Sequence, residues 1–264
     1  MDFQDQLIWI TGASSGIGEG LAKELSRRGA RLVLSARRME ELTRVRNECA
    51  YPEKVWTFQM DMTEHDRIPA VVEQVLRELG PVDILINNAG MTSRGLAVDT
   101  LLSVDKKMMD VNYFGPVALT KALLPQFIER KKGMIIVISS VIGKFGTALR
   151  SSYSPSKHAL HGFFDCLRGE LYPFGVRVVI AIPGYVKTEI TMRGIKGDGS
   201  PMEEMGHGQS HAMTTSDFAE RLLKALDSRR EEILIGGIRE MGGVYLKRFF
   251  PRLLSKLLRR AKLT

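Results

Sequence analysis

The chain has 264 residues, of which 44% are hydrophobic and 26% charged, and this is enough to bury one large α/β core. Its 38 bases exceed its 30 acids and give a net charge of +8. The two cysteines, Cys49 and Cys166, do not make a disulfide framework and fit a reducing compartment. The chain begins almost directly on an apolar run and contains no apolar stretch of 18 residues, so we expect neither a signal peptide nor a membrane-spanning helix.

Short apolar runs alternate with helix-length segments along the chain. The first run covers residues 6–10, and it leads through a glycine turn over 11–18 into a helix over 17–28. Later runs typical of buried parallel strands cover residues 32–34, 55–58, 82–86, 134–138, 176–182 and 233–235. Helices are expected over residues 39–49, 64–79, 101–130, 153–174 and 216–227. This alternation predicts a doubly wound (Rossmann) α/β fold, a parallel sheet with helices on both faces in a single domain.

The glycine turn after the first strand predicts a dinucleotide site. Gly12 permits the tight turn, Gly16 lets backbone approach a pyrophosphate, and Gly18 lets the helix pack close to the sheet. The first N–H groups of the helix, together with Ser14, Ser15 and Ile17, would then face the phosphates. The spacing Gly-x-x-x-Gly-x-Gly differs from the more familiar Gly-x-Gly-x-x-Gly, so an ordinary glycine turn is the alternative.

Three polar residues in the second half of the chain form a candidate acid–base set. Tyr153 and Lys157 are four residues apart, which places them on one face of a helix, and Ser140 lies 13 residues upstream of Tyr153. A tyrosine alone has a pKa of about 10, and a nearby ammonium is expected to lower it toward the range useful for proton transfer. Pro155 is compatible with this helix only in its first turn, which puts Tyr153 at the helix mouth.

Together, these motifs resemble the short-chain dehydrogenase/reductase family in its single-domain form. The resemblance covers roughly residues 6–236 and rests on the glycine turn, Asp61, the Asn-Asn-Ala-Gly run at 87–90, Asn112, Ser140, Tyr153 with Lys157, and Pro183-Gly184 followed by Thr188. It implies hydride transfer between a nicotinamide and a carbonyl or alcohol carbon, with Tyr153 as acid or base, Ser140 polarising the substrate oxygen and Lys157 holding the ribose. It also implies that Asn112 anchors a water that returns the proton through Lys157, although a locally satisfied helix polar group is an equal reading.

The resemblance further assigns residues to the cofactor. Asp61 would accept from the adenine amino group, and Thr188 would bond the carboxamide or the phosphates. The remaining residues expected along the cofactor are Asn87, Ala89, Gly90, Pro183, Gly184 and Val186. The helices over 101–130 and 153–174 form the subunit interface in much of the family, so a homodimer or homotetramer is expected.

The end of the second strand indicates which nicotinamide is used. Enzymes that select NAD usually place a carboxylate there to bond the ribose 2′-hydroxyl, whereas this chain has Ala36 followed by Arg37 and Arg38. A guanidinium can hold a 2′-phosphate by charge-assisted bonds, so the sequence favours NADP over NAD. The alternative is that both arginines are solvated charges at a helix start.

The segment expected to border the substrate gives a less specific signal. Residues 185–215 are rich in glycine and contain Met192, Met202, Met205 and Met213, which favours an adaptable apolar wall and a lipophilic substrate. A surface loop with locally packed methionines is the alternative. His207 and His211 lie in the same glycine-rich stretch and are read as loop polar residues, so no metal site is expected.

The C-terminal end differs from the rest of the chain. Apolar residues recur at helical spacing from Leu246 to Ala261, with seven bases and no acid from Lys247 onward. Without those seven, 31 bases face 30 acids, so the charge excess belongs to this segment. We expect domain 1–240 to be followed by a basic amphipathic helix over 241–264, broken or restarted at Pro251, which lies on an anionic membrane surface or docks on protein. Nucleic-acid binding is not expected, because aromatic residues and glycines do not alternate with the lysines and arginines of this segment.

Three functions fit these observations. The first is an NADP(H)-dependent oxidoreductase, such as a carbonyl reductase, that interconverts a lipophilic ketone or aldehyde and its alcohol, in the cytoplasm or peripheral to a membrane. The tail and the run from Lys157 to Leu171 resemble the hydroxysteroid-dehydrogenase-like branch of the family. The second is a 3-oxoacyl-thioester reductase acting on an acyl-carrier protein. The third is a nucleotide-sensing scaffold without activity, although such proteins commonly lose the tyrosine or the lysine.

Overall fold

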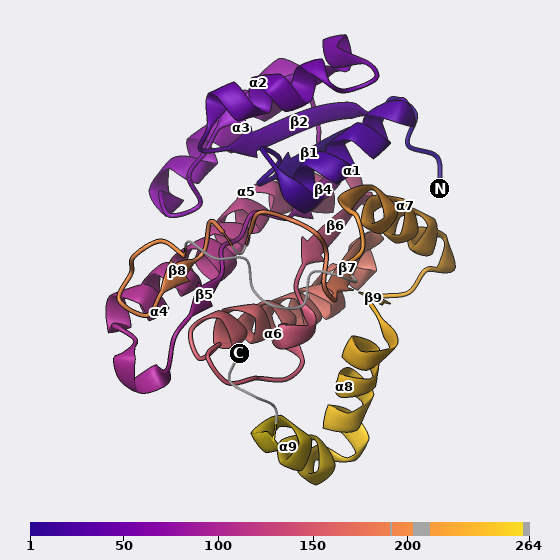
Figure 1. Ribbon diagram of the computed structural model, residues 1–264. Coiled ribbons are helices and arrows are strands. Elements are labelled where there is room, and N and C mark those ends of the chain that lie inside the picture. Colours follow the sequence, from indigo (N-terminus) through magenta and orange to yellow (C-terminus); the bar gives the residue numbers. More distant parts are fainter. Residues whose placement is uncertain (191, 203–211, 261–264) are drawn as a thin grey trace.

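The computed structural model describes residues 1–190, 192–202 and 212–260, and its centre is a parallel sheet (Figure 1). In the described part of the chain this sheet has seven strands in the order β3-β2-β1-β4-β6-β7-β9. Their bounds are Leu7–Thr11 (β1), Arg31–Ala36 (β2), Val55–Gln59 (β3), Ile84–Asn87 (β4), Gly133–Ile138 (β6), Val176–Pro183 (β7) and Glu232–Ile235 (β9). The doubly wound α/β prediction is therefore confirmed, with the order reversing between β1 and β4.

Helices cover both faces of the sheet because the strands carry apolar side chains on both sides. In β1, Ile8 and Ile10 belong to one buried core, whereas Leu7 and Trp9 belong to the other. The first core is covered by α1 (Gly16–Arg27), α2 (Met39–Asn47) and α7 (Thr215–Ala225). The second is covered by α3 (Ile68–Leu79), α5 (Gly115–Arg130) and α6 (Tyr153–Leu171).

The helices α1 and α7 lie side by side although they are nearly 200 residues apart in sequence (Figure 1). They approach closely at Gly20, where a Cβ atom would lie 2.8 Å from the carbonyl oxygen of Thr215. Phe218 and Leu222 of α7 are fully buried in the same core as Leu21 and Leu25 of α1. The last quarter of the chain thus completes the packing of its first helix.

The helix predicted over residues 101–130 is not a single α-helix. It consists of α4 (Leu102–Met109), a π-helical turn over Asp110–Phe114 and α5. Pro116 has no N–H to donate to the carbonyl of Asn112, four residues earlier, so the α-helical hydrogen-bond ladder cannot continue there. The widened turn carries Asn112 into the protein interior, where it is fully buried.

The segment after β7 is fastened to the body by a small second sheet that the sequence did not predict. In it β8 (Ile195–Lys196) pairs in parallel with β5 (Ser93–Arg94). The contact is tight, because a Cβ atom on Gly194 would lie 2.8 Å from Cγ2 of Thr92. Of the methionines expected to form an apolar wall, Met205 lies outside the described residues, as do His207 and His211.

The described part of the C-terminal segment forms two helices, α8 (Ile238–Phe249) and α9 (Pro251–Arg260). Phe250 has φ −134° and interrupts the helix just before Pro251, which cannot donate an interior helical hydrogen bond, so the second helix restarts at the proline where the sequence indicated a break or a restart. Leu254 is buried in the core that α6 covers, whereas Phe249 and Leu253 are exposed. The apolar residues of the tail are therefore divided between the body and the solvent. Within the described residues, no helix has the length and apolar character needed to cross a membrane.

Candidate active site

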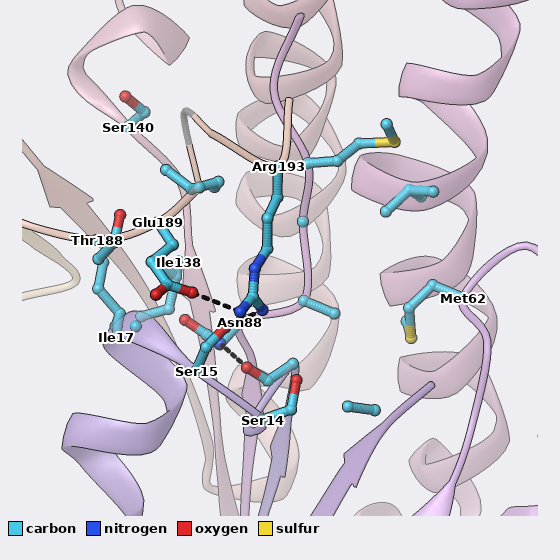
Figure 2. Close-up of a pocket in the computed structure, with 18 of the residues that line it drawn as sticks. Ser14, Ser15, Ile17, Met62, Asn88, Ile138, Ser140, Thr188, Glu189 and Arg193 are labelled. Carbon is cyan, nitrogen blue, oxygen red and sulfur yellow. Dashed lines mark hydrogen bonds and ion pairs between the residues drawn. The ribbon is translucent and has the colours of Figure 1, made fainter. Parts of the chain in front are cut away.

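The main pocket lies at the carboxyl edge of the sheet, where the strand order reverses (Figure 2). It is lined by residues that directly follow the ends of β1, β3, β4, β6 and β7, so the topology brings together motifs that are distant in sequence. A crevice outside the carboxyl ends of the strands at such a reversal is the usual ligand site of open α/β sheets.

The glycine turn shapes the floor of this pocket. Gly12 and Gly16 have φ +64° and +62°, in the left-handed region that favours glycine. A Cβ on Gly12 would lie 2.7 Å from Cα of Ala89, and a Cβ on Gly16 would lie 3.2 Å from Cγ2 of Thr188. Gly18 does not line the pocket but allows α1 to pack closely, since its Cβ would lie 2.4 Å from the Gly12 carbonyl oxygen. The three glycines therefore occupy the positions expected of a phosphate-binding turn.

Hydrogen bonds tie the glycine turn to the loop after β4. The Thr11 hydroxyl accepts from the backbone N–H groups of Asn88 and Ala89 at 3.0 and 2.9 Å. The Asn88 amide returns a bond to the Thr11 carbonyl at 2.9 Å. Asn87, which the sequence placed along the cofactor, points away: it is 1% exposed, donates to Thr120 at 2.9 Å and does not line the pocket. Because side chains alternate along a strand, the adjacent Asn88 faces the cleft instead.

Ser140, Tyr153 and Lys157 meet in the pocket. Ser140 follows β6, and Tyr153 opens α6, so Pro155 lies in the first turn of that helix as expected. The Ser140 hydroxyl lies near enough to Tyr153 to act on the pKa of its phenol, and it accepts a hydrogen bond from the Ile142 N–H at 3.3 Å. Lys157 lies one turn further along α6, and its Nζ donates to the Ile138 carbonyl at 3.0 Å. A proton donor, a second hydroxyl and an ammonium thus face the same space.

The charge environment of Tyr153 differs from the sequence expectation. Burial raises the pKa of its phenol, and this outweighs the lowering by the nearby Ser140 hydroxyl and by the positive charge of Arg150. The Arg150 guanidinium lies 5.9 Å from the centre of the Tyr153 ring and is held by bonds to the Thr92 hydroxyl and the Ser93 carbonyl at 2.8 and 2.9 Å. Arg150, which the sequence analysis missed, supplies a positive charge that acts to lower this pKa, although burial has the larger effect.

Burial also lowers the pKa of Lys157 to about 8, so its ammonium can lose a proton near neutral pH. The side chain is 4% exposed, and the desolvation of its charge is the cause of the shift. A lysine with this pKa can pass a proton as well as hold a hydroxyl group, which suits a group next to an acid–base tyrosine.

Asn112 holds the loop beside Lys157. Its Oδ1 accepts from the Met91 N–H at 2.8 Å, and its Nδ2 donates to the Met91 carbonyl at 3.0 Å and to the Ser156 hydroxyl at 2.9 Å. A Cβ on Gly90 would lie 3.2 Å from Oδ1 of Asn112 and 3.4 Å from Nζ of Lys157. The side chain therefore fastens α6 and the loop after β4 to one another and does not itself line the pocket.

Three guanidinium groups border the pocket. Arg37 and Arg38 follow β2, and Arg38 donates to the Ser14 hydroxyl at 3.1 Å. The third belongs to Arg193, which no motif indicated and which donates to the Ser15 hydroxyl at 3.1 Å. Asp61 lines the same region, with Oδ1 accepting from the N–H and the hydroxyl of Thr63, each at 2.9 Å.

Of the predicted site residues, all but Gly18, Asn87 and Asn112 line this one pocket. They are Gly12, Ser14, Ser15, Gly16, Ile17, Arg37, Arg38, Asp61, Ala89, Gly90, Ser140, Tyr153, Lys157, Pro183, Gly184, Val186 and Thr188. The lining residues that sequence analysis missed include Asn88, Ser139, Glu189 and Arg193. Asn88 and Ser139 directly adjoin predicted residues, whereas nothing in the spacing pointed to Arg193. Among the described residues no cluster of three or more metal-ligating side chains is found.

Comparison with known proteins gives the same answer as the geometry. The sequence model described as short chain dehydrogenase matches residues 6–198. The chain belongs to the short-chain dehydrogenase/reductase family. It is therefore an oxidoreductase of that family, acting on CH–OH groups, and the resemblance drawn from its motifs is confirmed.

The similarity to individual members of the family covers nearly the whole length of the chain. The chain is 42% identical to dehydrogenase/reductase SDR family member 7B of Xenopus tropicalis, over 94% of this chain and 82% of that protein. It is 40% identical to dehydrogenase/reductase SDR family member 7 of Homo sapiens, over 95% of this chain and 76% of that protein. A short-chain dehydrogenase structure from Streptomyces avermitilis is 30% identical, with a TM-score of 0.82 and 97% and 96% of the two chains covered.

The pocket fits a dinucleotide on its own geometry. The two left-handed glycines bring backbone close to the cleft, the start of α1 is directed into it, and three guanidinium groups border it. Ser140 and Tyr153 can then both bond one substrate oxygen, and Tyr153 can give that oxygen a proton or take one from it. Lys157 can hold a ribose hydroxyl and relay the proton.

Proposed function

We propose that the protein is an NADP(H)-dependent oxidoreductase that interconverts a lipophilic ketone or aldehyde and its alcohol. The observation that carries this proposal is the meeting of Ser140, Tyr153 and Lys157 in a pocket bordered by Arg37 and Arg38. A bound nicotinamide would supply or accept the hydride. The protein supplies the proton through Tyr153, and Ser140 polarises the same substrate oxygen.

The preference for NADP rests on the end of β2. Ala36 lines the pocket where a carboxylate would meet the ribose 2′-hydroxyl, so no negative charge at that position opposes a phosphate. Arg38 is fixed to the Ser14 hydroxyl beside it, and Arg37 lines the same wall. A 2′-phosphate in this place would find charge-assisted partners.

A lipophilic substrate is supported by the surroundings of Tyr153. The side chain packs against the small apolar cluster of Val104, Met108 and Ile195, with Met91 at its edge. Exposed apolar side chains continue outward along the segment after β7, with Tyr185, Ile190 and Met192 at 59%, 40% and 46% exposure. Within the family, these features favour the hydroxysteroid-dehydrogenase-like branch.

The decisive experiment is NADPH oxidation across a panel of carbonyl compounds, with Tyr153→Phe as the paired variant. The variant keeps the ring but loses the proton donor, so we expect turnover to fall by about 10²-fold or more while NADPH binding stays within a few-fold. Unchanged turnover would contradict the assignment. Including a 3-oxoacyl thioester on carrier protein tests the alternative, since exclusive activity on that thioester would identify an acyl-carrier-protein reductase. Tight cofactor binding without activity on any compound would favour a nucleotide-sensing scaffold.

We also propose that the C-terminal segment formed by α8 and α9 binds the surface of an anionic membrane without crossing it. Phe249, Phe250, Leu253 and Leu257 are between 47% and 66% exposed, while Leu254 anchors α9 to the body. Six bases adjoin these side chains, with no acid between residues 247 and 260. An amphipathic surface of this kind binds anionic lipid without spanning the bilayer.

For the assembly, we propose a homodimer or homotetramer through α5 and α6. Light scattering during size-exclusion chromatography measures the mass directly, and a monomer at micromolar concentration would contradict this proposal.

A further inference from the structure

Arg193 reaches across the cofactor pocket from the segment after β7 (Figure 2). Its Nη1 donates to the Ser15 hydroxyl at 3.1 Å, and its Nη2 forms an ion pair with the carboxylate of Glu189. Ser15 is the residue just before α1, so the guanidinium lies at the start of the helix that the glycine turn directs into the pocket. One side chain therefore links the segment over the substrate side to the predicted phosphate site.

Positive charge is concentrated at this point. The N-terminus of a helix carries a partial positive charge, and the Arg38 guanidinium lies nearby on the Ser14 hydroxyl. The pKa of Arg38 is lowered, first by burial and then by the charge of Arg193, so the two guanidinium groups oppose one another. Only the carboxylate of Glu189 compensates Arg193 among the ion pairs of the described residues. An anion with more than one negative charge would balance the two guanidinium groups and the helix N-terminus.

The position of Arg193 is set by its backbone. Its N–H donates to the Glu189 carbonyl at 3.0 Å, and the next strand starts at Ile195, whose N–H donates to the Thr92 carbonyl at 3.1 Å. Upstream, Thr188 lies over the glycine turn, since a Cβ on Gly16 would lie 3.2 Å from its Cγ2. The side chain thus extends from a segment that is fastened on both sides, which limits the ordering cost when it binds a ligand.

We propose that Arg193 binds the diphosphate of the cofactor, whether the cofactor is NAD or NADP. The side chain comes from the segment after β7, which borders the substrate side of the pocket. This inference rests on the proposed nucleotide-binding function and deepens it. Arg38 is tied to Ser14 at the end of β2, where a 2′-phosphate would lie, whereas Arg193 is tied to Ser15 at the start of α1, where the diphosphate would lie. Arg193 therefore serves NAD and NADP alike, and it couples cofactor binding to the segment that borders the substrate.

The test compares Arg193→Met with Lys196→Met, which removes an exposed positive charge from the same segment outside the pocket. Dissociation constants of NADPH and of NADH are measured by fluorescence titration at one ionic strength, after circular dichroism shows that each variant is folded. A hydrogen bond between charged groups corresponds to about 10- to 150-fold in affinity. We expect Arg193→Met to weaken both cofactors by about tenfold or more and by the same factor, and Lys196→Met to change neither by more than about twofold.

A double variant separates direct binding from an indirect effect of charge. Removing Arg193 alone also exposes the Glu189 carboxylate to the phosphates, so Glu189→Gln is combined with Arg193→Met. Affinity that stays low in the double variant supports direct contact, and affinity restored to the wild-type value overturns the proposal. Weakening confined to NADPH would place Arg193 at the 2′-phosphate and also overturns it. If the wild type binds neither cofactor, the proposed function itself is wrong, whereas normal binding by Arg193→Met refutes only the role of Arg193.

Discussion

Asn112 gives a quantitative test of how the pocket is held together. Its side chain is fully buried and makes three hydrogen bonds, two to the backbone of Met91 and one to the Ser156 hydroxyl. Asn112→Ala removes all three and leaves the Met91 N–H and carbonyl without these partners. The loop after β4 would then lose its attachment to α6, directly beside Lys157.

The magnitude follows from the groups left unpaired. Each buried polar group that loses its partner costs about 1–3 kcal/mol, and each lost bond about 1 kcal/mol. Met91 is half-buried, so water can reach some of the backbone groups that lose their partners. We therefore expect a loss of about 2–4 kcal/mol in the free energy of unfolding. For a protein of this size, 1 kcal/mol corresponds to roughly 2–4 °C in Tm, so Tm should fall by about 5–15 °C.

The assay is thermal and urea unfolding followed by circular dichroism, with the exposed Asn47→Ala as the matched control. The control should shift Tm by no more than about 2 °C, because surface changes usually stay within about 0.5 kcal/mol. An Asn112→Ala shift as small as that of the control would refute the reasoning. A large loss of turnover at unchanged stability would instead support the water-anchoring role that the family resemblance implies for Asn112.

Three further predictions concern the cofactor, the tail and pH. Ala36→Asp combined with Arg37→Ala should weaken NADPH and improve NADH, because a 2′-phosphate loses a partner and meets a like charge; a wild type that prefers NADH in titration contradicts this. Phe249→Ser with Phe250→Ser should reduce co-sedimentation with phosphatidylserine vesicles at low salt, and equal pelleting would show that these side chains do not insert. The pKa of Glu232 is lowered to about 2 by the His161 ring, whose Nδ1 lies 3.5 Å from the Glu232 carboxylate, and by its ion pair with Lys144. The contribution of Glu232 to the free energy of unfolding is therefore complete above pH 4.5 and is lost as pH falls toward 2. In urea titrations, the difference in free energy of unfolding between the wild type and Glu232→Gln should close over that range. A difference that does not change with pH would count against this ion pair.

The fold was predictable because its strands and helices have distinct periodicities. Each apolar run became a strand of the parallel sheet, and the glycine spacing placed the turn between β1 and α1. Errors arose where backbone chemistry interrupts a pattern that side chains continue. The proline at 116 produced a π-turn within an apparent long helix. The break in the tail, by contrast, could be read from Pro251, at which the second helix begins.

The site was less predictable than the fold. Residues in fixed motifs met in the pocket because strand ends converge at one edge of a parallel sheet. Arg150 and Arg193 could not be found in this way, since they belong to irregular segments whose course is set by tertiary contacts such as the pairing of β5 with β8. The expectation that Lys157 lowers the pKa of Tyr153 considered sequence spacing alone, without burial or the nearby arginine.

The packing of α7 on α1 has a consequence for biosynthesis. During synthesis the first helix emerges about 190 residues before Phe218, its partner in the core, at translation rates of about 5–20 residues per second. For that interval the apolar side chains of Leu21 and Leu25 lack their final cover, and the parallel strands must also wait for neighbours distant in sequence. The growing chain is therefore exposed to aggregation until nearly its end, and chaperone demand should concentrate on nascent chains shorter than the segment that carries α7.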